Sequence, residues 1–383
     1  MEMGKVFVAG VGFTKIAEHW DKSLEQLMAE AAAKALEDAG IPSVNSIYVG
    51  NMMGEALQEQ AHLGTLLAED LGLTGIPAFR IEAAEASGAA ALYQAALDIL
   101  SGRSEAVLVI GGEKLSDGLS EEVSSAMMMS GRQEYEGFIG ADFYAINGLL
   151  YRLYEKRYGS DGIAMFPVIS HTHAAGVSHA QYPFKLTLEK VLSSPFIAEP
   201  LRRMEVSGIG DGAAAVVLVG ERLAEKIKSP KTAFFIASST DYITPFEREN
   251  PLHFQSLAMA SDKVFEETKV ERREVDFIEL HDATSIMAAL SLESSGFVEP
   301  GKAGRLAEKG EFSLEGNLPC NTFGGLKARG HPFGATALYQ VAEAHLQLTE
   351  RAGNNQIDSA KIGLIQSLGG VAATAFAILM KKV

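Results

Sequence analysis

The chain has 383 residues, 47% of them hydrophobic and 38 of them glycine, a composition that suits two or three globular domains with large cores. Its 33 basic and 49 acidic residues give a formal net charge of −16, which argues against nucleic acid and membranes as partners. A single cysteine, Cys320, excludes a disulfide framework. We find no segment in which charged residues precede an apolar stretch, as in a secretion signal. No apolar run approaches the roughly 20 residues that a membrane-spanning helix needs, so we expect a cytoplasmic protein.

Predicted strands and helices alternate along the chain and recur in the same order in two halves. In the first half we expect strands at 6–11, 46–50 and 106–110 and an amphipathic helix at 24–39. In the second half the corresponding segments are strands at 233–238, 277–280 and 362–366 and a helix at 257–268. Strands this apolar indicate an α/β protein with mixed, mostly parallel sheets covered by helices on both faces.

A stretch of different character, residues 118–203, interrupts the first half before its last expected strand at 209–219. We expect it to form an inserted loop domain that covers a substrate. Its three histidines, His171, His173 and His179, lack acidic or cysteine ligands at useful spacing, so solvated or helix-capping roles are expected and no metal site is assigned. The expected domains are 1–117 completed by 204–225, then 118–203, and 226–383.

An internal repeat connects the two halves. Gly88-Ala-Ala-Ala-Leu-Tyr-Gln94 recurs as Gly334-Ala-Thr-Ala-Leu-Tyr-Gln340, at an offset of 334 − 88 = 246 residues. The same offset relates Glu85 to His331, so both residues stand where a helix is expected to begin. A helix N-terminus favours negative charge, and two such helices related by a pseudo-twofold axis would converge on one site. The simpler alternatives are a helix-start carboxylate at Glu85 and a tight turn around His331.

These and further motifs resemble the thiolase superfamily, in particular the archaeal and sterol-carrier-protein-X type, over nearly the whole chain. The matching segments are 82–92, 109–116, 208–215, His281-Asp282, 321–325, 330–334 and 367–370. The resemblance implies the thiolase fold, a duplicated five-layered αβαβα architecture. It also implies a homo-oligomer, dimer or tetramer, that takes a coenzyme A thioester as substrate and holds no tightly bound cofactor.

The resemblance also implies roles for individual residues. In thiolases a cysteine accepts the acyl group, a Gly-His-Pro histidine activates it, and a second histidine and backbone amides hold the thioester oxygen. Carried over to this chain, the retained groups are His331, His281 and the amides near Gly369 and Gly370. Glu85 stands in the place of the nucleophilic cysteine, and the sequence leaves open whether this substitution is natural or engineered. The positions that can supply a second cysteine are Ala283 and Ser367.

Our leading hypothesis is an enzyme that makes or breaks a C–C bond next to a coenzyme A thioester by retro-aldol or retro-Claisen chemistry. It would stabilise an enolate, with Glu85 as acid/base. Covalent attack by Glu85, through an anhydride, is a second route. One alternative is an acyltransferase subunit that acts on a bulky β-ketoacyl-CoA in a heteromeric complex. Another is a catalytically silent acyl-CoA-binding or scaffold protein.

Three further expectations concern ligands and partners. Lys327 and Arg329, in the loop before His331, are candidate ligands for the coenzyme A phosphates, although such pairs are often only solvated. Cys320 is either a replacement nucleophile or, as we expect, a buried inert thiol. By analogy with retro-aldol lyases related to thiolases, a small zinc-ribbon/OB-fold partner subunit is expected.

Overall fold

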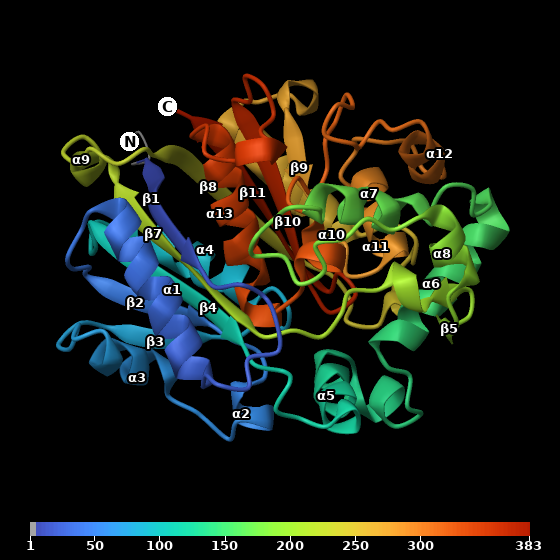
Figure 1. Ribbon diagram of the computed structural model, residues 1–383, viewed down its shortest axis with the longest axis horizontal. Helices are drawn as coiled ribbons and strands as arrows, with labels where there is room; N and C mark the ends of the chain where they lie inside the picture. Colours follow the sequence, from blue (N-terminus) through green and yellow to red (C-terminus); the bar gives the residue numbers. More distant parts are fainter. Residues whose placement is uncertain (1–4) are drawn as a thin grey trace.

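The computed structural model describes residues 5–383, and its first half builds one side of a large sheet (Figure 1). The predicted helix at 24–39 is confirmed as α1 (Leu24–Ala39). It begins at a reciprocal pair of hydrogen bonds between Ser23 and Gln26 and ends at Gly40 in the left-handed conformation. The other elements are β1 (Val6–Phe13), β2 (Ser46–Gly50), α2 (Gly54–Leu57), α3 (Leu63–Asp70), β3 (Ala78–Ile81), α4 (Ser87–Leu100), β4 (Ala106–Glu113), β7 (Gly212–Gly220) and α9 (Glu221–Ala224).

The second half contains the other strands of this sheet. Its elements are β8 (Thr232–Thr240), α10 (Gln255–Thr268), β9 (Phe277–Glu279), α11 (Ser285–Ser294), α12 (Ala303–Glu308), α13 (Thr336–Leu348), β10 (Ile362–Gly369) and β11 (Thr374–Lys382). The strand β11 is mostly buried, and the sequence analysis did not assign it. Within residues 5–383, no helix combines the length and the apolar character that a membrane crossing requires.

The strands form one nine-stranded mixed sheet in the order β3-β2-β4-β7-β1-β8-β11-β10-β9. Parallel pairs are confined to β3-β2-β4 and β10-β9, so antiparallel ladders take a larger share than the sequence analysis expects. For β10 and β11 the physical reason is the short turn 370–373, which returns the chain as a hairpin and so makes this pair antiparallel. The two halves meet where β1 pairs with β8.

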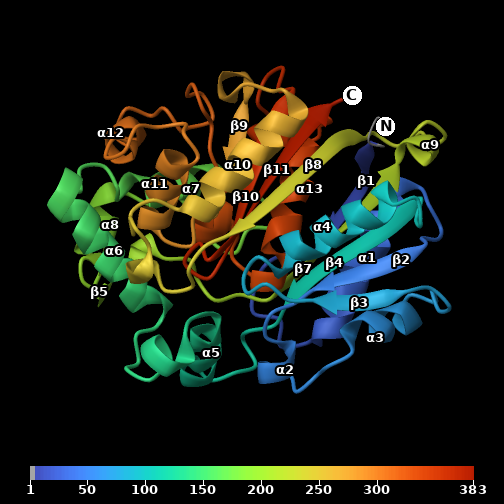
Figure 2. The ribbon, with the colours of Figure 1, turned by 180° about the vertical axis from the view of Figure 1, so that it is seen from behind.

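Helices cover both faces of the sheet and fill the space between its two halves. On the outer faces, α1 packs against β1, β4 and β7, and α10 packs against β8 and β11 (Figure 2). Between the halves, α4 packs against β2 and β4, while α13 packs against β10 and β7 and also touches α4. The layers therefore follow the αβαβα order expected for a duplicated fold.

The repeated glycines mark the point where α4 and the loop before α13 cross. A Cβ atom placed on Gly88 would lie 2.5 Å from the carbonyl oxygen of Gly334, and one placed on Gly334 would lie 2.6 Å from the carbonyl oxygen of Gly50. Only glycine permits this backbone approach. The segments related by the 246-residue offset are therefore in direct contact, as the pseudo-twofold hypothesis requires.

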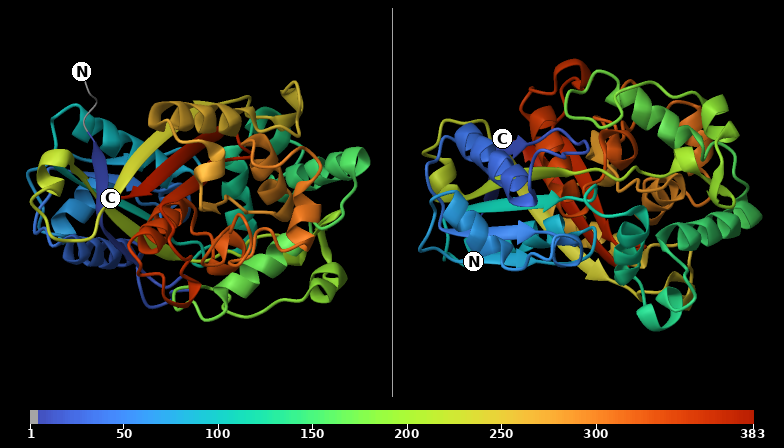
Figure 3. Two further views of the ribbon diagram at one scale, coloured as in Figure 1. Left: turned by 90° about the horizontal axis from the view of Figure 1, so that it is seen from above. Right: turned by 60° about the horizontal axis from the view of Figure 1, so that its bottom comes forward.

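The segment 118–203 lies beside the second half (Figures 1 and 3). Its helices pack through an apolar cluster shared with α11 and α10. Several large apolar side chains of this segment are nevertheless exposed, including Phe138 at 86% and Ile139 at 75%. Its elements are α5 (Ser120–Met127), α6 (Phe143–Tyr158), α7 (Met165–Ala174), α8 (Leu188–Ser193), β5 (Phe196–Ala198) and β6 (Leu201–Arg202).

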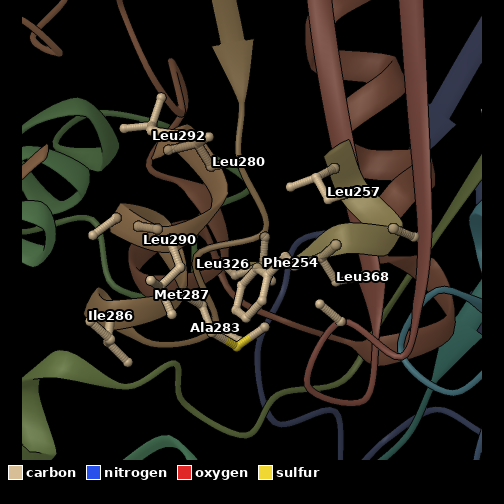
Figure 4. Packing of buried hydrophobic residues seen from close by; sticks show 14 of the residues in the cluster. Phe254, Leu257, Leu280, Ala283, Ile286, Met287, Leu290, Leu292, Leu326 and Leu368 are labelled. Carbon is tan, nitrogen blue, oxygen red and sulfur yellow. The ribbon is translucent and has the colours of Figure 1, made fainter. Parts of the chain in front are cut away.

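A buried apolar cluster in the second half fixes the backbone around the motif residues. Figure 4 shows Leu280 and Ala283, which flank His281 and Asp282, packed together with α11 residues such as Met287. Leu326, next to Lys327, and Leu368, next to Gly369, belong to the same cluster. Because these neighbours are fully buried, the polar residues beside them are held in fixed positions.

Candidate active site

Glu85 sits in a tight turn between β3 and α4. Ala84 has a positive φ of 51°, which is unusual for a residue with a Cβ. The Ser87 hydroxyl stabilises the turn, since it accepts from Ala83 N at 2.9 Å and donates to the Ala84 carbonyl at 2.6 Å. Glu82 accepts a further hydrogen bond from Ala84 N at 2.5 Å and so caps the turn. The turn directs Glu85 into the interior, where it is only 1% exposed.

Only one of the two carboxyl oxygens of Glu85 accepts a hydrogen bond. Oε2 accepts a hydrogen bond from the backbone N–H of Gly370 at 2.6 Å. Oε1 is buried and has no hydrogen-bond partner among the described residues. Burial raises the pKa of Glu85, against the opposing effect of its own backbone amide and that of Gly370. A proton can therefore reside on Oε1 without breaking any contact.

The turn between β10 and β11 reaches Glu85 because it contains two glycines. A Cβ atom on Gly369 would lie 2.5 Å from the carbonyl oxygen of Ala83. Gly370 has a φ of +56°, in the left-handed region that glycine tolerates best. The structure thus places both predicted glycines against the Glu85 turn, although the Gly370 amide is already engaged by the Glu85 carboxylate.

His281 and His331 lie beside each other on the other side of this turn. His281 follows β9, His331 precedes α13, and their rings are perpendicular with centroids 5.1 Å apart. His281 Nδ1 faces the backbone N–H of Leu368 at 3.3 Å, which makes Nδ1 the acceptor and places the proton on Nε2. In the described chain His281 Nε2 has no partner, so His281 presents a free N–H donor.

The hydrogen bonds of His331 assign it the opposite tautomer. Its Nδ1 lies 2.7 Å from the hydroxyl of Thr336, and that hydroxyl donates to the carbonyl of Pro332 at 3.1 Å. Because the hydroxyl proton is used there, His331 Nδ1 donates and Nε2 keeps its lone pair. The pair therefore combines one donor and one acceptor.

Burial keeps both imidazoles neutral. Burial lowers the pKa of His281 to about 3, and the nearby Arg329 charge acts in the same direction. The pKa of His331 is also well below its usual value, because of burial and then the neighbouring His281 and Arg329. A neutral donor and a neutral acceptor at a buried site can polarise a carbonyl and accept a proton.

The two predicted phosphate ligands, Lys327 and Arg329, lie in different environments. Lys327 is 6% exposed and lines a pocket of about 490 Å³. Arg329 is fully buried, with Nη1 3.7 Å from a carboxylate oxygen of Glu343 and its guanidinium over the ring of Tyr339. Arg329 therefore faces the interior, and only Lys327 is placed where a ligand could reach it.

The single cysteine is buried and unreactive in its surroundings. Cys320 is 3% exposed, and its thiol donates to the carbonyl of Leu318 at 3.3 Å. Burial raises the pKa of this thiol well above its usual value, and the charges of Glu279 and Asp282 add to the effect. These observations favour the inert thiol over the replacement nucleophile.

The expectation that the three histidines are solvated or cap helices is wrong. His171, His173 and His179 are 1%, 2% and 7% exposed. Their rings contact the Phe184 carbonyl, the carbonyls at positions 320 and 321, and the Glu343 carboxylate. Tertiary packing of α7 and the following loop buries them, which no local spacing could indicate. Within residues 5–383 no group of three His, Cys, Asp or Glu side chains is arranged to hold a metal.

The pocket next to Lys327 includes residues that the sequence analysis did not single out. Tyr144 lines it, and burial raises the pKa of Tyr144 to about 12, with charges that include Asp142 and Glu85 adding to the effect. The only sequence signal was the unusual number of tyrosines and histidines in the insertion.

Comparisons with known proteins agree with this geometry. Residues 6–222 match the family described as "Thiolase, N-terminal domain", and residues 237–382 match "Thiolase C-terminal domain-like". An acetyl-CoA acetyltransferase from Methanothermobacter thermautotrophicus is 37% identical, over 97% of this chain and 98% of its own.

Two solved structures share the fold. One is an "Ltp2-ChsH2(DUF35) aldolase", with a TM-score of 0.86 and 21% identity over 100% of this chain and 99% of that chain. The other is human mitochondrial 3-ketoacyl-CoA thiolase in complex with CoA, with a TM-score of 0.76 and 17% identity over 100% and 98% of the two chains. The expected fold class is confirmed.

Proposed function

This chain belongs to the thiolase family, and from that premise we propose that it makes or breaks a C–C bond adjacent to a coenzyme A thioester. We infer that Glu85 stands where thiolases carry their nucleophilic cysteine and that it acts as acid/base. One observation carries this proposal: Glu85 is a buried carboxyl group with raised pKa and an unengaged Oε1, and it is linked through the 368–370 turn to a neutral histidine pair.

In the proposed reaction each group handles a different atom. His281 donates its Nε2–H to the thioester oxygen and stabilises the enolate. The Glu85 carboxylate takes the proton from the carbon next to the thioester in the condensation direction, and the acid returns it in the cleavage direction. In cleavage, His331 Nε2 accepts the proton of the β-hydroxyl group while the C–C bond breaks. The proton then returns from His331 to Glu85 through solvent, which restores both groups.

Exchange of the α-protons of acetyl-CoA in deuterated water tests the proposal without knowledge of the second reactant. We expect wild type to incorporate deuterium, and His281→Ala to lose most of the rate because the enolate oxygen loses its donor. His253→Ala is a matched control, since His253 is only half-buried and lies outside the site. Calorimetric binding of acetyl-CoA without any exchange would refute the proposal and favour a silent acyl-CoA-binding protein.

Acyl transfer is a second candidate because the relative from Methanothermobacter thermautotrophicus is named an acetyl-CoA acetyltransferase. It would require a route that does not use Cys320, which is buried and hydrogen-bonded. Thiolysis of acetoacetyl-CoA by free coenzyme A measures it directly. Thiolysis faster than α-proton exchange would favour acyl transfer over enolate chemistry.

We also propose that the chain works as a homo-oligomer together with a small zinc-ribbon/OB-fold subunit. The aldolase that shares the fold combines Ltp2 with a ChsH2(DUF35) component, which supports this proposal. Exposed apolar side chains at Leu119, Tyr135, Phe138 and Ile139 offer an unpaired surface. Light scattering after size-exclusion chromatography tests the homo-oligomer, and copurification from the native host tests the partner. A monomeric chain without a partner would contradict both.

A further inference from the structure

The segment 118–203 and the core line a pocket of about 490 Å³. Its wall combines aromatic rings, hydroxyl groups and cations. The residues that set its chemistry are Glu18, Tyr144, His171, Tyr182, Arg203 and Lys327. Two backbone hydrogen bonds, from Gln181 N to the Arg329 carbonyl and from Tyr182 N to the Ala328 carbonyl, join the two segments that carry Tyr182 and Lys327. This part of the wall is therefore a fixed structure.

Lys327 is a buried cation without a counterion. It is 6% exposed, and no carboxylate in the described chain lies within ion-pairing distance of its ammonium group. The ammonium group lies over the ring of Tyr182, 5.7 Å from the ring centroid. Burial lowers the pKa of Lys327 to about 8, and Asp282 opposes this effect. A buried cation in this state gains from an anionic ligand.

The neighbours of Lys327 fit such a ligand. His171 is buried and donates from Nδ1 to the Phe184 carbonyl, so its Nε2, which has no partner in the described chain, can accept from a hydrogen-bond donor of the ligand and leaves the carboxylate to the cations. Arg203 is exposed, and its positive charge opposes the rise in the pKa of Tyr144 and of Tyr182. Glu18 is the one acidic residue that lines the pocket in the described chain. In a protein of net charge −16, this wall is a local excess of positive charge.

The position of Lys327 bears on which anionic part of a thioester it would bind, the acyl end or the phosphates. Leu326, the preceding residue, donates its N–H to Asp282 at 2.7 Å, and Asp282 directly follows His281. The extended pantetheine arm separates the sulfur from the nearest phosphate by ~15 Å, as estimated from standard chain dimensions. The backbone that carries Lys327 is thus fixed beside Asp282, and the inference places its ammonium group at the acyl end of the thioester.

We propose that Lys327 binds a carboxylate carried by the acyl group, so that the preferred substrates are thioesters of dicarboxylic acids. The inference rests on the proposed function, because it assumes that the thioester carbonyl lies at the histidine pair. Tyr182 packs beside the ammonium group, and the exposed Arg203 adds a second positive charge to the lining of the pocket.

Calorimetric titration can separate this inference from phosphate binding. The ligands are glutaryl-pantetheine, which has a free carboxylate and no phosphate, and its near-isosteric methyl ester, which is uncharged. The corresponding coenzyme A thioesters supply the phosphates. The proteins are wild type, Lys327→Met, Lys327→Arg and the control Lys185→Met, which changes an exposed lysine nearby. Thermal unfolding verifies that each variant is folded.

We expect wild type to bind the free carboxylate about ten-fold or more tightly than the ester, and Lys327→Met to abolish this preference. Lys327→Arg should keep part of it, and Lys185→Met all of it. Equal affinity of wild type for acid and ester would overturn the inference. An effect of Lys327→Met confined to the coenzyme A thioesters would also overturn it and assign the lysine to phosphate. Since binding is measured without turnover, a carboxylate preference with no α-proton exchange would refute only the proposed function.

Discussion

Glu85→Gln tests the proposed chemistry most directly, because it removes the titratable proton at position 85 and keeps the shape of the side chain. The amide oxygen of glutamine can still accept the hydrogen bond that Gly370 N donates to Oε2 at 2.6 Å. The amide nitrogen would replace Oε1, which has no partner in the described chain. The substitution therefore leaves the contacts of the turn in place.

The expected loss of rate follows from the role assigned to the proton. A positioned acid/base group typically contributes about 10²–10⁴-fold, or roughly 3–5 kcal/mol of barrier. We expect α-proton exchange of acetyl-CoA to fall by a factor in this range, with binding of acetyl-CoA changed by less than about three-fold. Mass spectrometry of the recovered thioester measures the exchange, and Glu82→Gln is the control because Glu82 only caps the Ala84 amide.

The stability of the same variant has a defined pH dependence. Because burial raises the pKa of Glu85 in the folded state, its favourable contribution is complete below the unfolded value of 4.5 and is lost as pH rises through the folded value. Glu85→Gln should therefore gain stability relative to wild type as the pH rises, by about 1.4 kcal/mol per unit of pKa elevation. An exchange rate within two-fold of wild type, or a stability difference that is constant between acid and alkaline pH, would refute the reasoning.

The same geometry makes three further predictions. Glu85→Cys should create a thiol at a helix start that acetyl-CoA acylates, as intact-mass analysis would show; an unmodified protein would mean that the site cannot present a thioester to position 85. Gly88→Ala should lower the free energy of unfolding by about 1–3 kcal/mol, because the added methyl group meets the Gly334 carbonyl at 2.5 Å. Gly118→Ala, whose methyl group would meet side chains at 3.2 Å, should cost less, and equal costs would contradict the close backbone crossing at Gly88. Cys320→Ala should keep full activity and lose roughly 1 kcal/mol of stability, and a loss of turnover would restore Cys320 as a nucleophile.

Local signals in the sequence were sufficient to predict those elements whose ends are marked by capping residues. α1 matches its prediction to the residue because Ser23 and Gly40 define its ends. The repeat predicted that the segments of Gly88 and Gly334 correspond, and the structure places them in contact. By contrast, the strand β11 was missed because the apolar run 369–380 has no alternation when both faces are buried.

Features that depend on residues distant in the chain were beyond sequence reasoning. Arg329 is interior because Glu343, on α13, faces its guanidinium, and no spacing rule predicts that pairing. His179 is buried for the same reason, since its ring contacts Glu343. The hydrogen bond between Glu85 and Gly370 joins residues 285 positions apart, so the engaged state of that amide could not be read from either motif.

The charges around the site connect the proposed chemistry with the proposed substrate class. Arg329 is balanced by Glu343, and the histidine pair is neutral, so the reacting centre itself holds little net charge. Lys327 is a buried cation that lacks a counterion in the described chain. His281 stabilises the developing enolate charge, and Glu85 becomes uncharged as it takes the α-proton, so the two groups do not oppose each other at that step. An anionic substituent gains most at Lys327. The carbonyl end of one acyl group would therefore bind at the neutral histidine pair, and its carboxylate end at the cationic lysine.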